Sequence, residues 1–104
     1  ASGEHRLTAA LRRAELLGRA GEIDAAQAVL AEVRTADDPQ AVEQSWLTEA
    51  SVLREAGDRD AAYAVLTEAV GQLPDSIAIR YSRALVAAEP RPVVDADGRT
   101  VAKL

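Results

Sequence analysis

Apolar residues along this chain recur every three or four positions, with polar residues between them. This spacing places the apolar side chains on one face of an α-helix. Two successive stretches follow it, the first with Trp46, Ala50 and Leu53, the second with Ala62, Leu66 and Ala69. The pattern therefore predicts an all-α fold.

Turn-forming residues divide this pattern into five expected helices. Asp38 before Pro39 is typical of a helix start, because the carboxylate caps the first amides and proline needs no amide partner there. A glycine after the last apolar residue is typical of a helix end, which is the place of Gly57. We expect helices over residues 3–20, 22–35, 39–56, from the turn at Asp58 or Asp60 to 70, and from a cap at Asp75 to 89, with Gly71 and Pro74 ending the fourth.

An internal repeat relates the first two pairs of helices. The stretch GEIDAAQAVL from Gly21 returns as GDRDAAYAVL from Gly57, 36 residues later. Self-similarity at this spacing is typical of stacked helical arrays, in which each hairpin buries its apolar face against a neighbour. The expected units are residues 3–36, 39–73 and 75–89, that is, two hairpins followed by one further helix.

The residues of the second unit resemble the tetratricopeptide repeat. That family has the pattern W-x2-L-G-x2-Y, then A-x3-F, then P. This chain has Trp46-x2-Glu49-Ala50-x2-Leu53, then Ala62-x3-Leu66, then Pro74. The family's small slots hold Ala14, Ala26, Ala50, Ala62 and Ala84, and its bulky slots hold Leu17, Leu30, Leu53 and Leu66. The resemblance covers residues 7–89 and implies a short right-handed solenoid of about two and a half repeats, within a domain over residues 1–91.

One slot departs from the family pattern. Where the family usually has leucine, the three units hold Arg13, Glu49 and Arg83. Equivalent slots of adjacent units lie side by side in such a stack, so the three charges could form a ladder of ion pairs. They could equally be three solvated charges, because exposed ion pairs are often incidental.

Composition excludes several kinds of partner. The 104 residues carry a formal net charge of −5, which argues against a nucleic-acid surface built from clustered lysine and arginine. No stretch approaches the roughly 20 apolar residues of a membrane span, so direct membrane insertion is not expected. The chain does not begin with methionine, so we expect it to be a piece of a longer protein. Its abundant alanine and arginine suggest a bacterial source, and the absence of cysteine is compatible with either the cytoplasm or the periplasm.

The chemistry for catalysis is missing from the sequence. His5 is the only histidine, so the serines have no histidine partner. Carboxylates such as Asp37 and Asp38 lie at expected helix starts, where the helix dipole favours negative charge. With no glycine-rich phosphate loop either, we expect neither an enzyme nor a cofactor.

The tail over residues 92–104 has two competing interpretations. Asp97-Gly98 between apolar residues is typical of a β-hairpin turn, whereas Val101 could occupy the large slot of a degenerate last helix. A calcium site at Asp95 and Asp97 is a weak alternative, since the remaining ligands of an EF-type loop are missing. We also expect this tail, or a second chain, to cover the last helix.

The resemblance implies a concave groove lined by the first helix of each unit. Its expected residues are Leu11, Glu15, Arg19, Leu47, Ser51, Arg54, Tyr81 and Leu85, with Glu55 beside Arg54. The four apolar members would form a stripe suited to a helix or extended segment of a partner protein. Family members that grip chaperone tails use Lys, Asn and Arg in this groove. Here those positions hold Leu11, Glu15, Thr48, Ala78 and Ser82, so a chaperone-tail receptor is not expected.

Two functions follow from this surface. The first is a protein-interaction module that holds a peptide or helix of a partner. The second is structural, with the repeats acting as a spacer or self-assembly unit, including homo-oligomers, in an envelope or polysaccharide-export protein.

Overall fold

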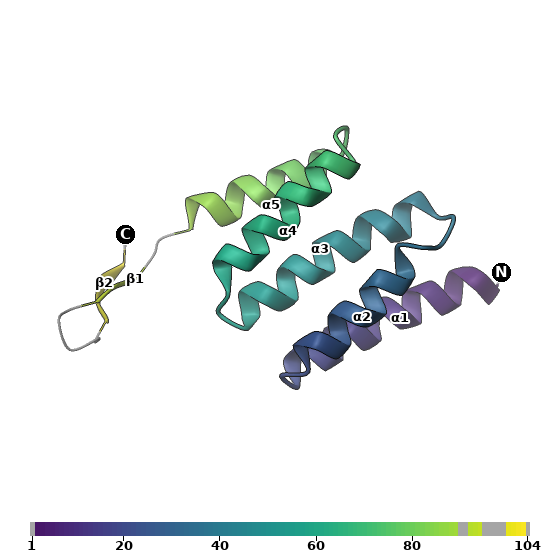
Figure 1. The fold of residues 1–104 in the computed structure, drawn as a ribbon, viewed down its shortest axis with the longest axis horizontal. Coiled ribbons are helices and arrows are strands. Elements are labelled where there is room, and N and C mark those ends of the chain that lie inside the picture. The colour runs from purple at the N-terminus through teal and green to yellow at the C-terminus, as the bar shows by residue number, and fades with distance from the viewer. Residues whose placement is uncertain (1, 90–91, 95–99, 104) are drawn as a thin grey trace.

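The computed structural model describes residues 2–89, 92–94 and 100–103, and the side chains of residues 6–89. It contains five helices in the expected order (Figure 1). They are α1 (Ser2–Arg19), α2 (Ile23–Val33), α3 (Pro39–Glu55), α4 (Arg59–Gln72) and α5 (Ile77–Ala88). The prediction of an all-α arrangement of five helices is confirmed.

The turns within both hairpins have the same backbone geometry. Gly21 and Gly57 follow α1 and α3 with φ angles of 84° and 86°, a region that side-chain-bearing residues rarely adopt. Asp38 caps α3 by accepting from the Ala41 amide at 3.2 Å, and Asp58 caps α4 by accepting from the Ala61 amide at 3.0 Å. Glycine and aspartate therefore fix these helix ends as the sequence predicted.

Two expected boundaries near residues 70–76 are wrong. Helix α4 continues through Gly71 to Gln72, because glycine in a helix costs only about 1 kcal/mol relative to alanine. The helix ends where Leu73 adopts a non-helical conformation before Pro74, whose ring disfavours helical geometry in the preceding residue. Ser76, and not Asp75, caps α5, since its hydroxyl accepts from the amide of the third residue of the helix at 3.2 Å.

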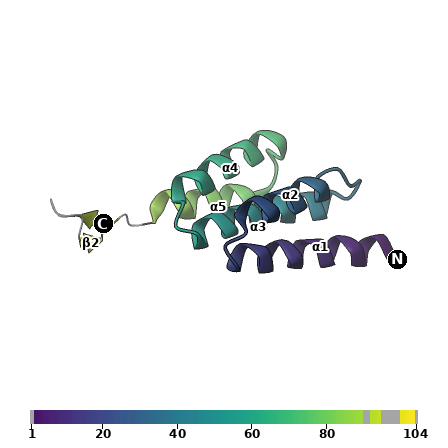
Figure 2. The same ribbon diagram turned by 60° about the horizontal axis from the view of Figure 1, so that its bottom comes forward.

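The helices form two layers (Figure 2). Helices α1, α3 and α5 lie side by side in one layer, and α2 and α4 cover them from the other. Small residues allow this approach, because Ala14 and Ala26 are fully buried between α1 and α2, and Ala50 and Ala62 are buried between α3 and α4. The larger fully buried side chains include Leu30 and Leu66, at equivalent positions of the two hairpins.

Apolar side chains gather into two clusters. The first contains Ala14, Ala26, Val29, Leu30 and Val52. The second contains Trp46, Ala50, Leu53, Ala62, Leu66, Ala69, Ile79 and Val86. Each cluster draws on more than one unit, so neither hairpin is buried without its neighbour.

The tail forms two short strands where the structure describes it. Strand β1 (Pro92–Val94) pairs antiparallel with β2 (Thr100–Lys103), and Val93 lies opposite Ala102. Both the Asp97-Gly98 turn and the weak calcium alternative at Asp95 and Asp97 lie outside the described residues.

The described strands contact each other and none of the helices. The expectation that the tail covers α5 is therefore wrong for this part of it. Three large apolar residues of α5 are consequently exposed: Ile77 by 76%, Tyr81 by 63% and Leu85 by 46%.

Candidate functional site

A surface hollow of about 370 Å³ lies between α1 and α3, where two adjacent first helices meet. Helix α1 contributes Leu7, Thr8, Leu11, Arg12 and Glu15 to its lining, and α3 with its cap contributes Asp38, Gln40, Ala41, Gln44 and Thr48. Of the residues expected to line a groove, this hollow brings together Leu11 and Glu15.

The floor and the rim of this hollow differ in chemistry. The least exposed residues of the lining are Ala41 and Thr48, which are buried, and Leu7, Leu11 and Asp38, which are half-buried, so the floor contains both apolar and polar groups. The rim is exposed and polar. It consists of Thr8, Arg12, Glu15, Gln40 and Gln44. Hydroxyl, amide and charged groups around a partly apolar floor can bind a peptide through both its backbone and its side chains.

The other expected groove residues lie elsewhere. Leu47, expected to line the groove, is half-buried and packs against the cluster that contains Trp46. Arg19 and Ser51 are exposed, and Arg54 forms an ion pair with Glu89 at the end of α5. Leu11 also packs partly against its own cluster. The four apolar residues therefore do not form one continuous exposed stripe.

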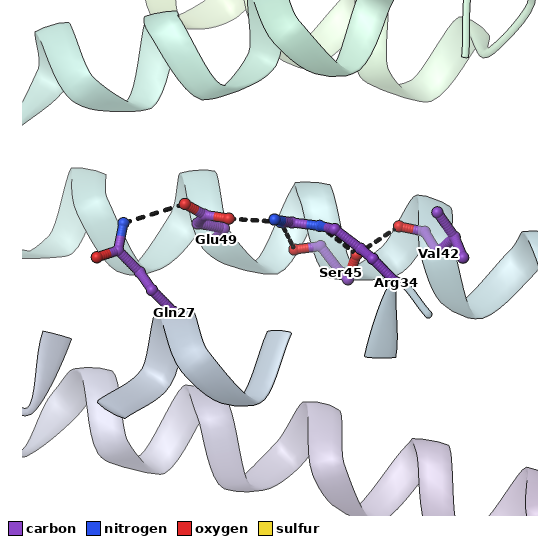
Figure 3. Close-up of polar contacts among 5 residues, drawn as sticks. All are labelled: Gln27, Arg34, Val42, Ser45 and Glu49. Atoms are coloured by element: carbon purple, nitrogen blue, oxygen red, sulfur yellow. Dashed lines mark hydrogen bonds and ion pairs between the residues drawn. The ribbon is translucent and has the colours of Figure 1, made fainter. Parts of the chain in front are cut away.

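A buried polar network that the sequence analysis missed joins the two hairpins (Figure 3). The Arg34 guanidinium donates from Nη2 to Glu49 Oε1 at 2.5 Å, and from Nε to Ser45 Oγ at 2.9 Å. Gln27 Nε2 donates to the second carboxylate oxygen of Glu49 at 3.0 Å. Ser45 in turn donates to the carbonyl of Val42 at 2.6 Å. Because Glu49 is only 7% exposed, these bonds replace water around its carboxylate.

Arg34 also covers the single tryptophan of the chain. The carbon centre of its guanidinium lies 3.7 Å from the centroid of the Trp46 ring, well within the range of a cation–π contact. Trp46 is itself 7% exposed. Arg34 thus connects α2 with α3 in two ways. Its charge pairs with Glu49, and the flat face of its guanidinium lies over Trp46.

This network replaces the expected charge ladder, which is wrong. Glu49 accepts a hydrogen bond from Gln27 in α2 and forms an ion pair with Arg34 at the end of α2. Within the described residues, neither Arg13 nor Arg83 forms an ion pair. The signal for the network was present in the sequence. Glu49 is buried, whereas Arg13 at the equivalent position of the first unit is exposed, and a buried carboxylate requires donors from the helix packed on it. The residues that supply them, Gln27 and Arg34, also depart from their repeat equivalents, Tyr63 and Val70.

In comparisons with known proteins, no family model, no curated protein and no solved structure matches the chain. In the described ranges, no group of three or more His, Asp and Glu side chains is placed to hold a metal ion. No helix among the described residues is long and apolar enough to cross a membrane.

Proposed function

We propose that this chain is a helical-repeat module of the tetratricopeptide type that binds a peptide segment of a partner protein between α1 and α3. The repeat assignment rests on the 36-residue spacing, on the matching turns at Gly21 and Gly57, and on the paired alanines between the helices of each hairpin. The chain would form part of a larger bacterial protein, and we propose neither catalysis nor a cofactor.

The hollow between α1 and α3 is the observation that carries the binding role. Its partly apolar floor and mixed polar rim suit an extended peptide, whose side chains would reach Leu11 and Ala41 while its backbone meets Thr8 and Gln44. Arg12 and Glu15 place charges of both signs on the rim, with the carboxylate of Asp38 nearby in the same lining. A partner segment carrying both a basic and an acidic residue would be complementary to it.

Selection from a random peptide library on the purified protein tests this function. Peptides that bind should lose affinity at least tenfold in Gln44→Arg, because the added side chain enters the hollow from an exposed position. The matched control is Thr67→Arg, which adds the same group at an exposed position of α4, and binding should be unchanged. Failure to select any peptide, or equal binding by Gln44→Arg, would contradict the proposal.

A structural role is the second candidate. It is favoured by the exposed apolar residues Ile77, Tyr81 and Leu85 of α5, which could pack against further repeats or another copy of the chain. Sedimentation over a range of concentrations separates the two candidates. Association that disappears in a Tyr81→Glu variant, with no peptide selected by the monomer, would favour the spacer.

A further inference from the structure

A second hollow, of about 660 Å³, lies between α1 and α2, away from the hollow proposed to bind a peptide. Helix α1 contributes Arg6, Leu7, Ala9, Ala10 and Arg13 to it, and α2 with the turn after it contributes Val29, Glu32, Val33, Thr35 and Ala36. The two hollows share Leu7 alone among these residues.

The internal repeat shows which residues of the second hairpin correspond to the lining of this hollow. Ala10 is 36 residues before Trp46, and Val33 is 36 residues before Ala69. Trp46 and Ala69 belong to the same buried cluster, and Val65, the equivalent of Val29, packs against it. The repeat therefore matches Ala10 and Val33, which line the hollow between α1 and α2, with Trp46 and Ala69, two members of one buried cluster in the second hairpin.

The first hairpin lacks this indole because Ala10 has only a methyl group in its place. Val33 is larger than Ala69, yet the hollow remains. Its floor is apolar, since Val29 and Val33 are buried and Ala10 is half-buried. An apolar floor next to exposed polar groups can hold one anchoring side chain of a partner.

The rim of the hollow also matches an aromatic ligand. Arg34, at the end of α2 in the first hairpin, covers the ring of Trp46 in the second hairpin at 3.7 Å. Arg6 and Arg13 line the hollow of the first hairpin, are exposed, and form no ion pair within the described residues. A guanidinium on a flexible side chain can move over an aromatic ring that enters from solvent.

We propose that the hollow between α1 and α2 binds an aromatic side chain, of the indole class, presented by a partner protein. The ring would lie against Ala10 and Val33 in the place that Trp46 occupies in the second hairpin, and Arg13 or Arg6 would cover it. Because the two hollows share only Leu7 among their lining residues, the proposal holds or fails independently of peptide binding between α1 and α3. The chain's own tryptophan is buried, so a second copy could offer only its exposed tyrosines, Tyr63 and Tyr81.

A titration with N-acetyl-tryptophanamide, followed by amide chemical shifts, tests the proposal. We expect saturable shifts concentrated in residues 7–13 and 29–36, with a dissociation constant in the millimolar range that is usual for one unconnected side chain. N-acetyl-leucinamide should bind at least fivefold more weakly. No saturable shift, or equal binding of the two probes, would overturn the proposal.

Two tryptophan variants of the same helix provide the matched comparison. Ala10→Trp should fill the hollow from within, raise the melting temperature, and weaken binding of the probe at least tenfold. Leu16→Trp places the same ring at an exposed position of α1 that lines neither hollow, so probe binding should remain. If Ala10→Trp does not fold, Ala10→Leu fills part of the space and should weaken binding several-fold.

Two results would overturn the proposal at this stage. Probe binding that persists in Ala10→Trp would place the ligand elsewhere. Concentration-dependent shifts in the same residues without any probe, removed by Tyr81→Ala or Tyr63→Ala, would mean that the hollow serves a second copy of the chain.

Discussion

The two interfaces between neighbouring first helices, α1 with α3 and α3 with α5, use equivalent positions in different ways. At the first interface, Gly18 lies so close to Val52 that an added Cβ would be 2.7 Å from a methyl carbon of the valine. The repeat places Arg54 where Gly18 stands, and there the side chain reaches out to an ion pair with Glu89. Close contact holds one interface, and a longer polar side chain bridges the other.

The second helices show a similar contrast. Arg34 at the end of α2 binds α3 through Ser45 and Glu49, whereas its equivalent in the second unit, Val70, packs against the apolar cluster. The side chain that α5 buries most deeply is Ile79. Two hairpins with nearly the same internal sequence therefore present different surfaces to their neighbours. This difference specifies the order in which the units stack.

The largest expected effect concerns what the two hairpins share. Leu30→Ala and Leu66→Ala remove fully buried side chains at equivalent positions, so each should lower the free energy of unfolding by about 2 to 5 kcal/mol. Urea denaturation followed by circular dichroism measures both. A loss below about 1 kcal/mol in either variant would mean that its hairpin lacks the packed core described above.

The buried network should have the next largest effect, and only at the first interface. Glu49→Ala leaves the Arg34 guanidinium without its carboxylate, at a cost of about 1 to 3 kcal/mol in unfolding free energy. Glu68→Ala, at an exposed position of α4, is the control and should change stability by no more than about 0.5 kcal/mol.

A double variant sharpens this test. Combining Arg34→Val with Glu49→Leu gives the interface the apolar residues of the second unit and of the family pattern. It should recover most of the loss, because replacing both members of a buried pair is far less costly than removing one. A double variant as unstable as the sum of the two single ones would contradict the direct pairing of Arg34 with Glu49.

The close approach of α1 to α3 should produce a smaller loss. Gly18→Ala introduces a methyl group that meets both γ-carbons of Val52, at 2.7 and 2.9 Å, so we expect a loss of about 1 to 2 kcal/mol. Gly71→Ala is the matched control, because a Cβ there meets nothing within 4 Å and alanine favours a helix by about 1 kcal/mol. Thermal unfolding should therefore move in opposite directions for the two glycines. Val52→Ala should relieve part of the effect at Gly18.

The ion pair of the second interface should contribute least. Arg54 and Glu89 are partly exposed, so Arg54→Ala should reduce stability by no more than about 1 kcal/mol. The effect should shrink further in 0.5 M salt, where the Debye length is only a few ångströms. A loss as large as that of Glu49→Ala would remove the contrast between the two interfaces.

The contrast also shows which parts of the molecule the sequence could predict. Helix ends depended on local rules, and Gly21, Gly57, Asp38 and Asp58 all follow them. The end of α4 was misplaced because Gly71 was expected to end the helix, whereas the helix continues through it and ends before Leu73 and Pro74.

Contacts between units were harder to predict, because they depend on which side chains two separate helices bring together. The expected ladder matched Glu49 with its repeat equivalents, whereas its true partner, Arg34, lies at the end of the preceding helix. Likewise, Leu47 was expected to line the groove, and yet it packs partly against the core. Of the expected groove residues, the hollow contains Leu11 and Glu15 of α1. The sequence analysis missed Gln44 and the other residues that α3 contributes, and it had considered Thr48 only as a position of the chaperone-tail clamp.

The most direct test of the proposed function is to map where a selected peptide binds. Amide chemical shifts of the labelled protein, recorded while the peptide is added, should change most around Thr8, Arg12, Gln44 and Thr48, on both sides of the hollow between α1 and α3. Changes confined to α4 or to the exposed face of α5 would contradict the account, because the peptide would then bind outside that hollow.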